Sequence, residues 1–194
     1  MEGLLTLGVL GSGKGSNFRA IMERIRRGEL NARVGIVISD VPDAGILSLA
    51  RDFQVPALYV QPGRFRTKLD PDAEQDVVRR LQGAGVDLVV LAGFMRVVKA
   101  PLLRAFRRRI INIHPSLLPK YRGLEAWKQA LAAGERVTGC TVHYVDEGVD
   151  TGEIIAQREV AIMPGDTPES LHARIQAAEH ALLPEVIARF AGMG

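Results

Sequence analysis

Residues 4–17 join an apolar run, a glycine-rich loop and the start of a helical pattern, in the order Leu4-Leu5-Thr6-Leu7-Gly8-Val9-Leu10-Gly11-Ser12-Gly13-Lys14-Gly15-Ser16-Asn17. A short apolar run of this kind is typical of a buried strand, which we expect over residues 4–10. Glycines let a backbone approach a ligand closely, and a helix N-terminus presents unpaired amides to an anion. The segment therefore predicts a strand followed by a phosphate-binding loop, with a purely structural tight turn as the alternative.

The glycine spacing separates this loop from two common nucleotide-binding motifs. Gly11, Gly13 and Gly15 lie two residues apart, so the dinucleotide fingerprint G-x-G-x-x-G fails at its last position. A Walker loop is excluded because Lys14 is followed by Gly15 instead of Ser or Thr. The hypothesis of a phosphate loop therefore depends on its position before a helix and on its composition.

The rest of the chain alternates strand patterns with helical patterns. Further strands are expected at residues 32–39, 57–60, 88–91 and 109–113, and helices at 17–27, 45–53, 72–84 and 101–106. This alternation is typical of right-handed βαβ units with a parallel sheet. In the last third, strands at 137–145 and 153–160 flank a polar loop. A long helix at 167–190 follows, which Pro184 should kink or split.

These patterns predict an α/β fold in a single domain over residues 1–194. The domain should hold a Rossmann-like, mostly parallel sheet with helices on both faces and an antiparallel C-terminal strand region. The length of 194 residues and the 47% hydrophobic content suit one domain with a buried core. The net charge of +3 is too mild to indicate a nucleic-acid partner.

Cysteine usage and apolar runs bear on the location of the protein. The single cysteine, Cys140, excludes a disulfide framework and a Cys-rich metal site. The N-terminal apolar run lacks the basic lead and small-residue cleavage site of a signal peptide. The apolar segment at residues 88–95 is too short to span a bilayer. We therefore expect a cytoplasmic protein without a membrane partner.

The most informative stretch is Arg109-Ile110-Ile111-Asn112-Ile113-His114-Pro115. Side chains alternate along a strand, so Asn112 and His114 should share a face before Pro115 ends the pairing. In open parallel sheets, ligands bind at the carboxyl ends of strands where the strand order reverses, here expected between the first and fourth strands. The stretch thus predicts an amide and an imidazole side by side at a binding edge.

An amide donor and a protonated imidazole together suit the stabilisation of an oxyanion in acyl transfer. A metal site is not expected, because His143, His172 and His180 are scattered and match no metal-binding spacing. A carboxylate neighbour should raise the pKa of His114 above about 6.5. The loop at 146–152 offers Asp146, Glu147 and Asp150, and the residues alone do not select among them; a solvated hairpin turn is the alternative.

The run Asn112-Ile113-His114-Pro115-Ser116-Leu117-Leu118-Pro119, with Tyr121 and Gly123 after it, resembles the signature of the folate-dependent formyltransferases. Gly93-Phe94-Met95-Arg96 and Asp150-Thr151-Gly152 resemble two further elements of that family. Gly15-Ser16-Asn17 is similar to the phosphate loop of the members that formylate glycinamide ribonucleotide. The resemblance covers essentially the whole chain, in order.

The resemblance implies that a formyl group passes from 10-formyltetrahydrofolate, a co-substrate, to the amine of glycinamide ribonucleotide, without a metal. It implies a monomer or homodimer, with phosphate binding in the N-terminal half and folate binding and catalysis in the C-terminal half. The implied catalytic residues are Asn112, His114 and Asp150. The implied ribonucleotide contacts are Gly15, Ser16, Asn17, Gln176 and Glu179. The implied folate contacts are Lys68, Met95, Arg96, Val97, Val98, Asn112 and the loop residues Asp146, Glu147, Gly148, Val149 and Asp150.

Three other functions are weighed against this one. Methionyl-tRNA formyltransferase shares the catalytic strand but needs an additional C-terminal domain, and formyltetrahydrofolate hydrolase carries an N-terminal regulatory domain; neither is expected in 194 residues. A non-catalytic nucleotide-binding module would leave the grouping of Asn112, His114 and Asp150 unexplained. Some members of the family have Arg in place of Lys68, which would allow a bidentate contact with the folate tail.

Overall fold

A computed structural model describes residues 4–192. Seven strands form one sheet in the order β3-β2-β1-β4-β5-β6-β7. The strands are β1 (Leu5–Leu10), β2 (Ala32–Ser39), β3 (Ala57–Tyr59), β4 (Leu88–Leu91), β5 (Ile110–His114), β6 (Val137–Tyr144) and β7 (Ile154–Ala161). The first five pair in parallel, whereas β6 and β7 are antiparallel to their neighbours. The predicted α/β class and the antiparallel C-terminal strands are confirmed.

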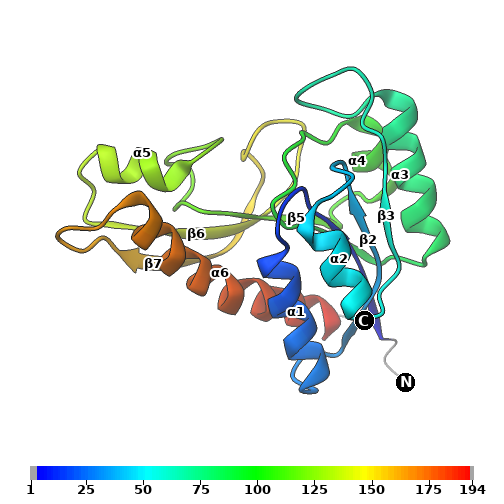
Figure 1. Ribbon diagram of the computed structural model, residues 1–194, viewed down its shortest axis with the longest axis horizontal. Coiled ribbons are helices and arrows are strands. Elements are labelled where there is room, and N and C mark those ends of the chain that lie inside the picture. The colour runs from blue at the N-terminus through cyan, green and yellow to red at the C-terminus, as the bar shows by residue number, and fades with distance from the viewer. Residues whose placement is uncertain (1–3, 193–194) are drawn as a thin grey trace.

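Six helices connect and cover these strands (Figure 1). They are α1 (Ser16–Arg26), α2 (Gly45–Asp52), α3 (Pro71–Gly83), α4 (Ala100–Ala105), α5 (Ala126–Ala132) and α6 (Pro168–Ala191). The predicted boundaries are within one residue of the observed ones, as expected for fraying ends. The seven-residue α5 had no predicted counterpart. The helix α6 continues through Pro184, so a split there is wrong.

The period-2 alternation of the strands divides the core into two layers. On β1, Leu7 and Val9 pack with α1, α2 and α6, while Leu10 faces the opposite layer beneath α3 and α4. Both layers consist mainly of buried aliphatic side chains, whose removal from water is the main stabilising contribution. Helices therefore cover both faces of the sheet, as predicted.

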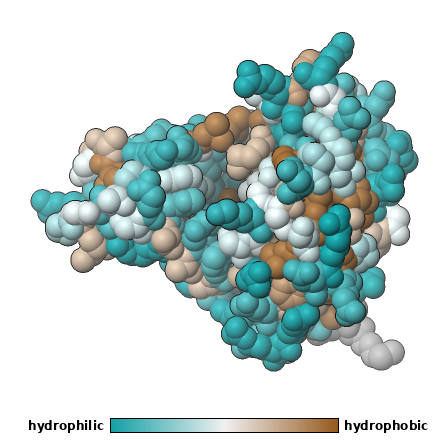
Figure 2. Space-filling view, viewed as in Figure 1, coloured by the Kyte–Doolittle hydropathy of each residue, from teal (hydrophilic) through white to brown (hydrophobic). Residues whose placement is uncertain are grey.

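The antiparallel strands β6 and β7 extend away from the parallel part of the sheet, and α6 runs back from them to lie beside α1 (Figure 1). Hydrophilic side chains cover most of the visible face, and hydrophobic groups gather near its centre (Figure 2). This arrangement brings the carboxyl ends of β1, β4 and β5 together at one edge of the sheet. None of the helices within residues 4–192 combines the length and apolarity that a membrane span requires.

Candidate active site

The loops after β1 and β4 are fastened together at the carboxyl edge of the sheet. The amide of Ser12 donates to the carbonyl of Gly93 at 3.0 Å, and the amide of Ala92 donates to the carbonyl of Leu10 at 2.9 Å. The strand order changes direction between β1 and β4, as predicted for the binding edge. These bonds fix the loops that frame the end of β5.

Asn112 and His114 lie on one face of β5 and both reach the same carboxylate. The Nδ1 atom of His114 is 3.3 Å from Oδ2 of Asp150, and the Nδ2 atom of Asn112 is 3.5 Å from Oδ1 of the same residue. His114 is only 5% exposed, so this contact is shielded from water. The expected pairing on a strand face is thus confirmed, and an acid from the 146–152 loop completes it.

Asp150 is the one acid of the three candidates that reaches the strand end. Its backbone is left-handed, with φ of 53°, and its Oδ2 accepts the Gly123 amide at 2.9 Å. Asp146 instead accepts the Gly148 amide and the Thr151 hydroxyl, which closes the loop on itself. Glu147 contributes only its backbone carbonyl, which accepts from Lys99.

His143 also lies in this cluster, where no role was predicted for it. Register places His143 on β6 directly opposite Asn112. Its Nε2 lies 3.1 Å from Asn112 Nδ2 and 3.6 Å from Asp150 Oδ1, and its Nδ1 lies 2.7 Å from the Tyr144 carbonyl. Because Nδ1 must donate to that carbonyl, Nε2 is the acceptor for the Asn112 amide in the neutral ring. Only the antiparallel register of β5 and β6 places His143 beside Asn112, and the sequence alone does not give that register.

Burial changes the expected protonation of His114. Desolvation lowers the pKa of His114 below its ordinary value of 6.5, against the attraction of Asp150 and the hydrogen bond to the Tyr121 carbonyl. Asp150 raises the pKa as expected, but the expectation that the pKa would lie above about 6.5 is wrong because burial lowers it by more. The desolvation of a cation with 5% exposure outweighs one carboxylate at 3.3 Å.

The Tyr121 carbonyl fixes which nitrogen of His114 faces the site. It lies 2.8 Å from Nε2, so Nε2 carries a proton and donates to it. The Ser116 hydroxyl, which donates to the Lys120 carbonyl at 2.6 Å, holds the same turn together. Nδ1 is therefore the ring nitrogen that is left to exchange protons beside Asp150.

Asp150 is ionised at neutral pH. Burial would raise its pKa, but the contact with His143, the attraction of His114 and the Gly123 amide together hold the pKa below 3.8. A charged carboxylate thus stands next to a buried, mostly neutral imidazole. Asp150 can therefore stabilise the positive charge that His114 acquires when its ring takes up a proton.

The residues of the predicted phosphate loop lie at the N-terminus of α1. Gly15 adopts a left-handed φ of 81°, and a Cβ there would lie 2.8 Å from Ile46, so only glycine fits. The Asn17 amide donates to Oε2 of Glu179 on α6 at 3.1 Å. Burial raises the pKa of Glu179 to about 7, although the Asn17 bond opposes the shift. Gln176 lies on the same helix, partly exposed, one turn before Glu179.

The predicted folate residues occupy different environments. Met95 is 59% exposed and Val149 is 50% exposed, whereas Val98 is buried in the core. Lys68 and Val97 form an isolated parallel bridge that joins the 61–70 loop to the segment after β4. Their backbones line the same edge of the sheet, but the Val98 side chain faces away from any ligand.

The Arg96 side chain is hydrogen-bonded within the protein. Its Nε donates to Oδ2 of Asp40 at 2.6 Å, and its NH1 donates to the carbonyls of Phe65, Arg66 and Lys68. Asp40 also accepts from the Ser12 hydroxyl. Arg96 therefore anchors the 61–70 loop through two of its three guanidinium nitrogens. Within residues 4–192, no group of three His, Cys, Asp or Glu side chains is arranged to hold a metal ion.

Comparisons with known proteins agree with this geometry. A profile of the formyl transferase family matches residues 6–187. Phosphoribosylglycinamide formyltransferase of Bacillus subtilis is 42% identical over 185 residues, 95% of this chain and 94% of that protein. The trifunctional purine biosynthetic protein adenosine-3 of Drosophila melanogaster is 50% identical over 184 residues, but the chain spans 13% of its length. The crystal structure of glycinamide ribonucleotide transformylase 1 from Symbiobacterium toebii has a TM-score of 0.93 at 49% identity, covering 98% of this chain and 89% of that one.

Proposed function

Because the chain belongs to the formyl transferase family, we propose that it transfers the formyl group of 10-formyltetrahydrofolate to the amine of glycinamide ribonucleotide. Formyl transfer to phosphoribosylglycinamide is the activity in the name of the Bacillus subtilis relative, which the chain matches over 94% of its length. The observation that carries the proposal is the convergence of Asn112, His114 and Asp150 at the end of β5. An amide, an imidazole and a carboxylate together supply what acyl transfer to an amine needs.

Asn112 supplies the oxyanion donor in this proposal. Its Nδ2 carries two protons, one of which is held by His143 at 3.1 Å. The other points to Asp150 over a weaker 3.5 Å contact. The oxyanion that forms on the formyl oxygen would accept a shorter, charge-assisted hydrogen bond from this second N–H. His143 therefore acts as a positioning residue for the amide.

His114 moves the proton between the two nitrogens of the reaction. As the amine attacks the formyl carbon, its N–H proton passes to Nδ1 of His114, and the resulting imidazolium is stabilised by Asp150 at 3.3 Å. Collapse of the tetrahedral intermediate breaks the bond to the donor nitrogen, which takes the proton back from Nδ1. The Tyr121 carbonyl keeps Nε2–H out of this exchange.

The two substrates would approach along different elements of one domain. Gly15, Ser16 and Asn17 would hold the ribonucleotide phosphate at the α1 N-terminus, with Gln176 and Glu179 beside them. The formyl donor would lie along residues 95–98, Lys68 and the 146–150 loop, through backbone contacts at Arg96 and Val98. The proposal includes a cytoplasmic location and action on small molecules by a monomer or homodimer, without nucleic acid.

The decisive experiment is an assay of deformylation of 10-formyltetrahydrofolate with and without glycinamide ribonucleotide. We expect loss of the formyl group only when the ribonucleotide is present, with formylated product in equal amount. Equal rates in its absence would indicate a hydrolase and contradict the proposal. Binding of the donor without turnover in either condition would indicate a binding module.

A further inference from the structure

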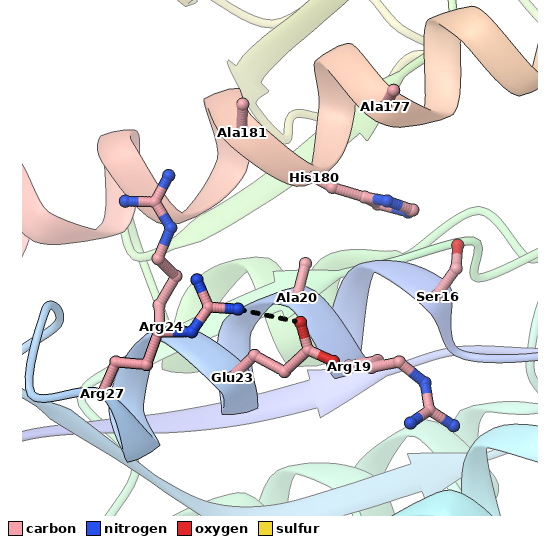
Figure 3. Close-up of a pocket in the computed structure, with 9 residues that line it drawn as sticks. All are labelled: Ser16, Arg19, Ala20, Glu23, Arg24, Arg27, Ala177, His180 and Ala181. Carbon is pink, nitrogen blue, oxygen red and sulfur yellow. Dashed lines mark ion pairs between the residues drawn. The ribbon is translucent and has the colours of Figure 1, made fainter.

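A groove runs between α1 and α6, starting at the proposed phosphate loop (Figure 3). It has a volume of about 320 Å³, and Ser16 lies at one end of it. Three arginines line it, namely Arg19, Arg24 and Arg27, against the single carboxylate of Glu23. The groove is therefore a positively charged extension of the loop that holds the α1 N-terminus.

The three arginines differ in their partners. Arg24 pairs with Glu29 at 3.3 Å, and Arg27 pairs with Glu23 at 3.6 Å. In the part of the chain that the structure describes, no carboxylate lies within 4 Å of the Arg19 guanidinium. Arg19 is thus the arginine of the groove whose charge is not already neutralised.

The position of Arg19 directs its side chain toward the loop. Residues i and i+3 share a helix face, and helical side chains lean toward the N-terminus, so Arg19 reaches back over Ser16. Figure 3 shows the His180 ring extending from α6 toward α1 near Ser16, and the Arg19 side chain extending toward the same end of α1 on the side away from α6. Their charge and donors therefore add to the unpaired amides of the first turn of α1.

His180 brings an unsatisfied polar atom to the same place. Its Nε2 is buried and has no hydrogen-bond partner among residues 4–192. A native buried polar atom without a partner calls for an explanation, such as a ligand that supplies one. Burial lowers the pKa of His180, partly against Glu23, and the neutral ring keeps one N–H to donate.

We infer that Arg19 and His180 bind the phosphate group of the ribonucleotide from the groove side, opposite the amides of the Gly15–Asn17 loop. The inference rests on the proposed function and adds two residues to the proposed site. A phosphate held by a guanidinium, an imidazole and helix amides is surrounded by donors on two sides. The groove then selects phosphorylated acceptors over the same amine without a phosphate.

Steady-state kinetics of Arg19→Gln and His180→Gln test the inference. We expect Arg19→Gln to raise the KM for glycinamide ribonucleotide at least about tenfold, with kcat and the KM for the formyl donor within about twofold, because a charge-assisted bond in the ground state is lost. His180→Gln should raise the same KM by a smaller factor. With the unphosphorylated glycinamide riboside as acceptor, Arg19→Gln and the unaltered protein should have equal kcat/KM.

The matched control is Arg27→Gln, which removes a charge from the same groove where it is already paired with Glu23. It should leave the KM for the ribonucleotide within about twofold. A KM change for Arg19→Gln no larger than that of Arg27→Gln would overturn the inference. So would an equal loss of kcat/KM with the riboside.

Binding of inorganic phosphate separates failure of this inference from failure of the proposed function. Calorimetric titration should detect phosphate binding to the unaltered protein and at least about tenfold weaker binding to Arg19→Gln, and phosphate should compete with the ribonucleotide. Phosphate binding that depends on Arg19 without any formylation would overturn the function but keep an anion site. Formylation with phosphate binding that ignores Arg19, or inhibition that is not competitive, would overturn the inference alone.

Discussion

The Nδ2 atom of Asn112 donates to Nε2 of His143 at 3.1 Å across the antiparallel pair β5–β6. The bond fixes the orientation of an amide whose oxygen and nitrogen would otherwise be interchangeable. His143 in turn is held by its own contact with the Tyr144 carbonyl at 2.7 Å. The proposed oxyanion donor is thus oriented by a residue of the neighbouring strand.

We therefore expect His143→Ala to lower kcat about tenfold to a hundredfold with little change in either KM, because the amide loses its orientation and not its ligand contacts. His143→Gln, which can present an acceptor to Asn112, should recover part of the rate. Steady-state kinetics with both substrates varied will measure this. A His143→Ala rate equal to that of the unaltered protein would show that Asn112 needs no such support.

Substitution of the proposed proton-transfer residues, His114 and Asp150, should lower kcat more than substitution of His143. His114→Ala and Asp150→Asn should each lower kcat by about 10²–10⁴, the usual range for a positioned proton-transfer group. Binding of a folate analogue, followed by fluorescence titration, should change little, because His114 is not among the proposed folate contacts and Asp150→Asn keeps the shape of its side chain. Turnover that stays near normal in either variant would contradict the proposed proton path.

The protonation of His114 can be followed directly by NMR titration of its ring. Because burial lowers the pKa of His114, the ring should titrate below 6.5, and Asp150→Asn should lower it further by removing the attraction that opposes burial. The unfolded chain then binds this proton more readily, so the His114 contribution to stability is present above pH 6.5 and is lost as the pH falls through the folded pKa. A measured pKa of His114 above 6.5 would contradict this prediction and would indicate that the ring is protonated in the resting protein.

Glu179 should make the free energy of unfolding depend on pH in the opposite direction to His114. Its pKa is raised from 4.5 to about 7, so the native state holds a proton that the unfolded state releases. Its contribution to stability is present below pH 4.5 and is lost as the pH rises through 7. Glu179→Gln should therefore raise the free energy of unfolding at pH 8 relative to pH 5, by on the order of 3 kcal/mol at most. Chemical denaturation at both pH values will test this, and equal effects would contradict the shift.

Arg96 should matter for stability more than for ligand contact. Arg96→Ala leaves Asp40 and three loop carbonyls without their donor, and both charged side chains are mostly buried. We expect a loss of about 3–5 kcal/mol in the free energy of unfolding. Arg79→Ala, which breaks an exposed pair with Asp76, should cost at most about 1 kcal/mol. Equal losses in thermal or chemical unfolding would show that the 61–70 loop does not depend on Arg96.

Periodicity was sufficient to predict the order and type of nearly all elements. The shared face of Asn112 and His114 followed from strand alternation alone, because that relation is local. The choice of Asp150, the place of His143 and the lowered pKa of His114 depend on strand register and burial, which arise from pairing between distant segments. The helix α5 was missed because it is short and follows Glu125, which is left-handed and has no side-chain cap bond, and because it lacks the N-terminal proline that marks the start of the equally short α4.

The contact between Asn17 and Glu179 spans 162 residues of sequence. A ribosome adding about 5–20 residues per second would need roughly 10–30 s to make the intervening chain. The proposed phosphate loop is therefore made well before the buried acid that meets it on α6. The proposed ribonucleotide site would be assembled only after α6 has been made, so a nascent chain that still lacks α6 would not hold the substrate there.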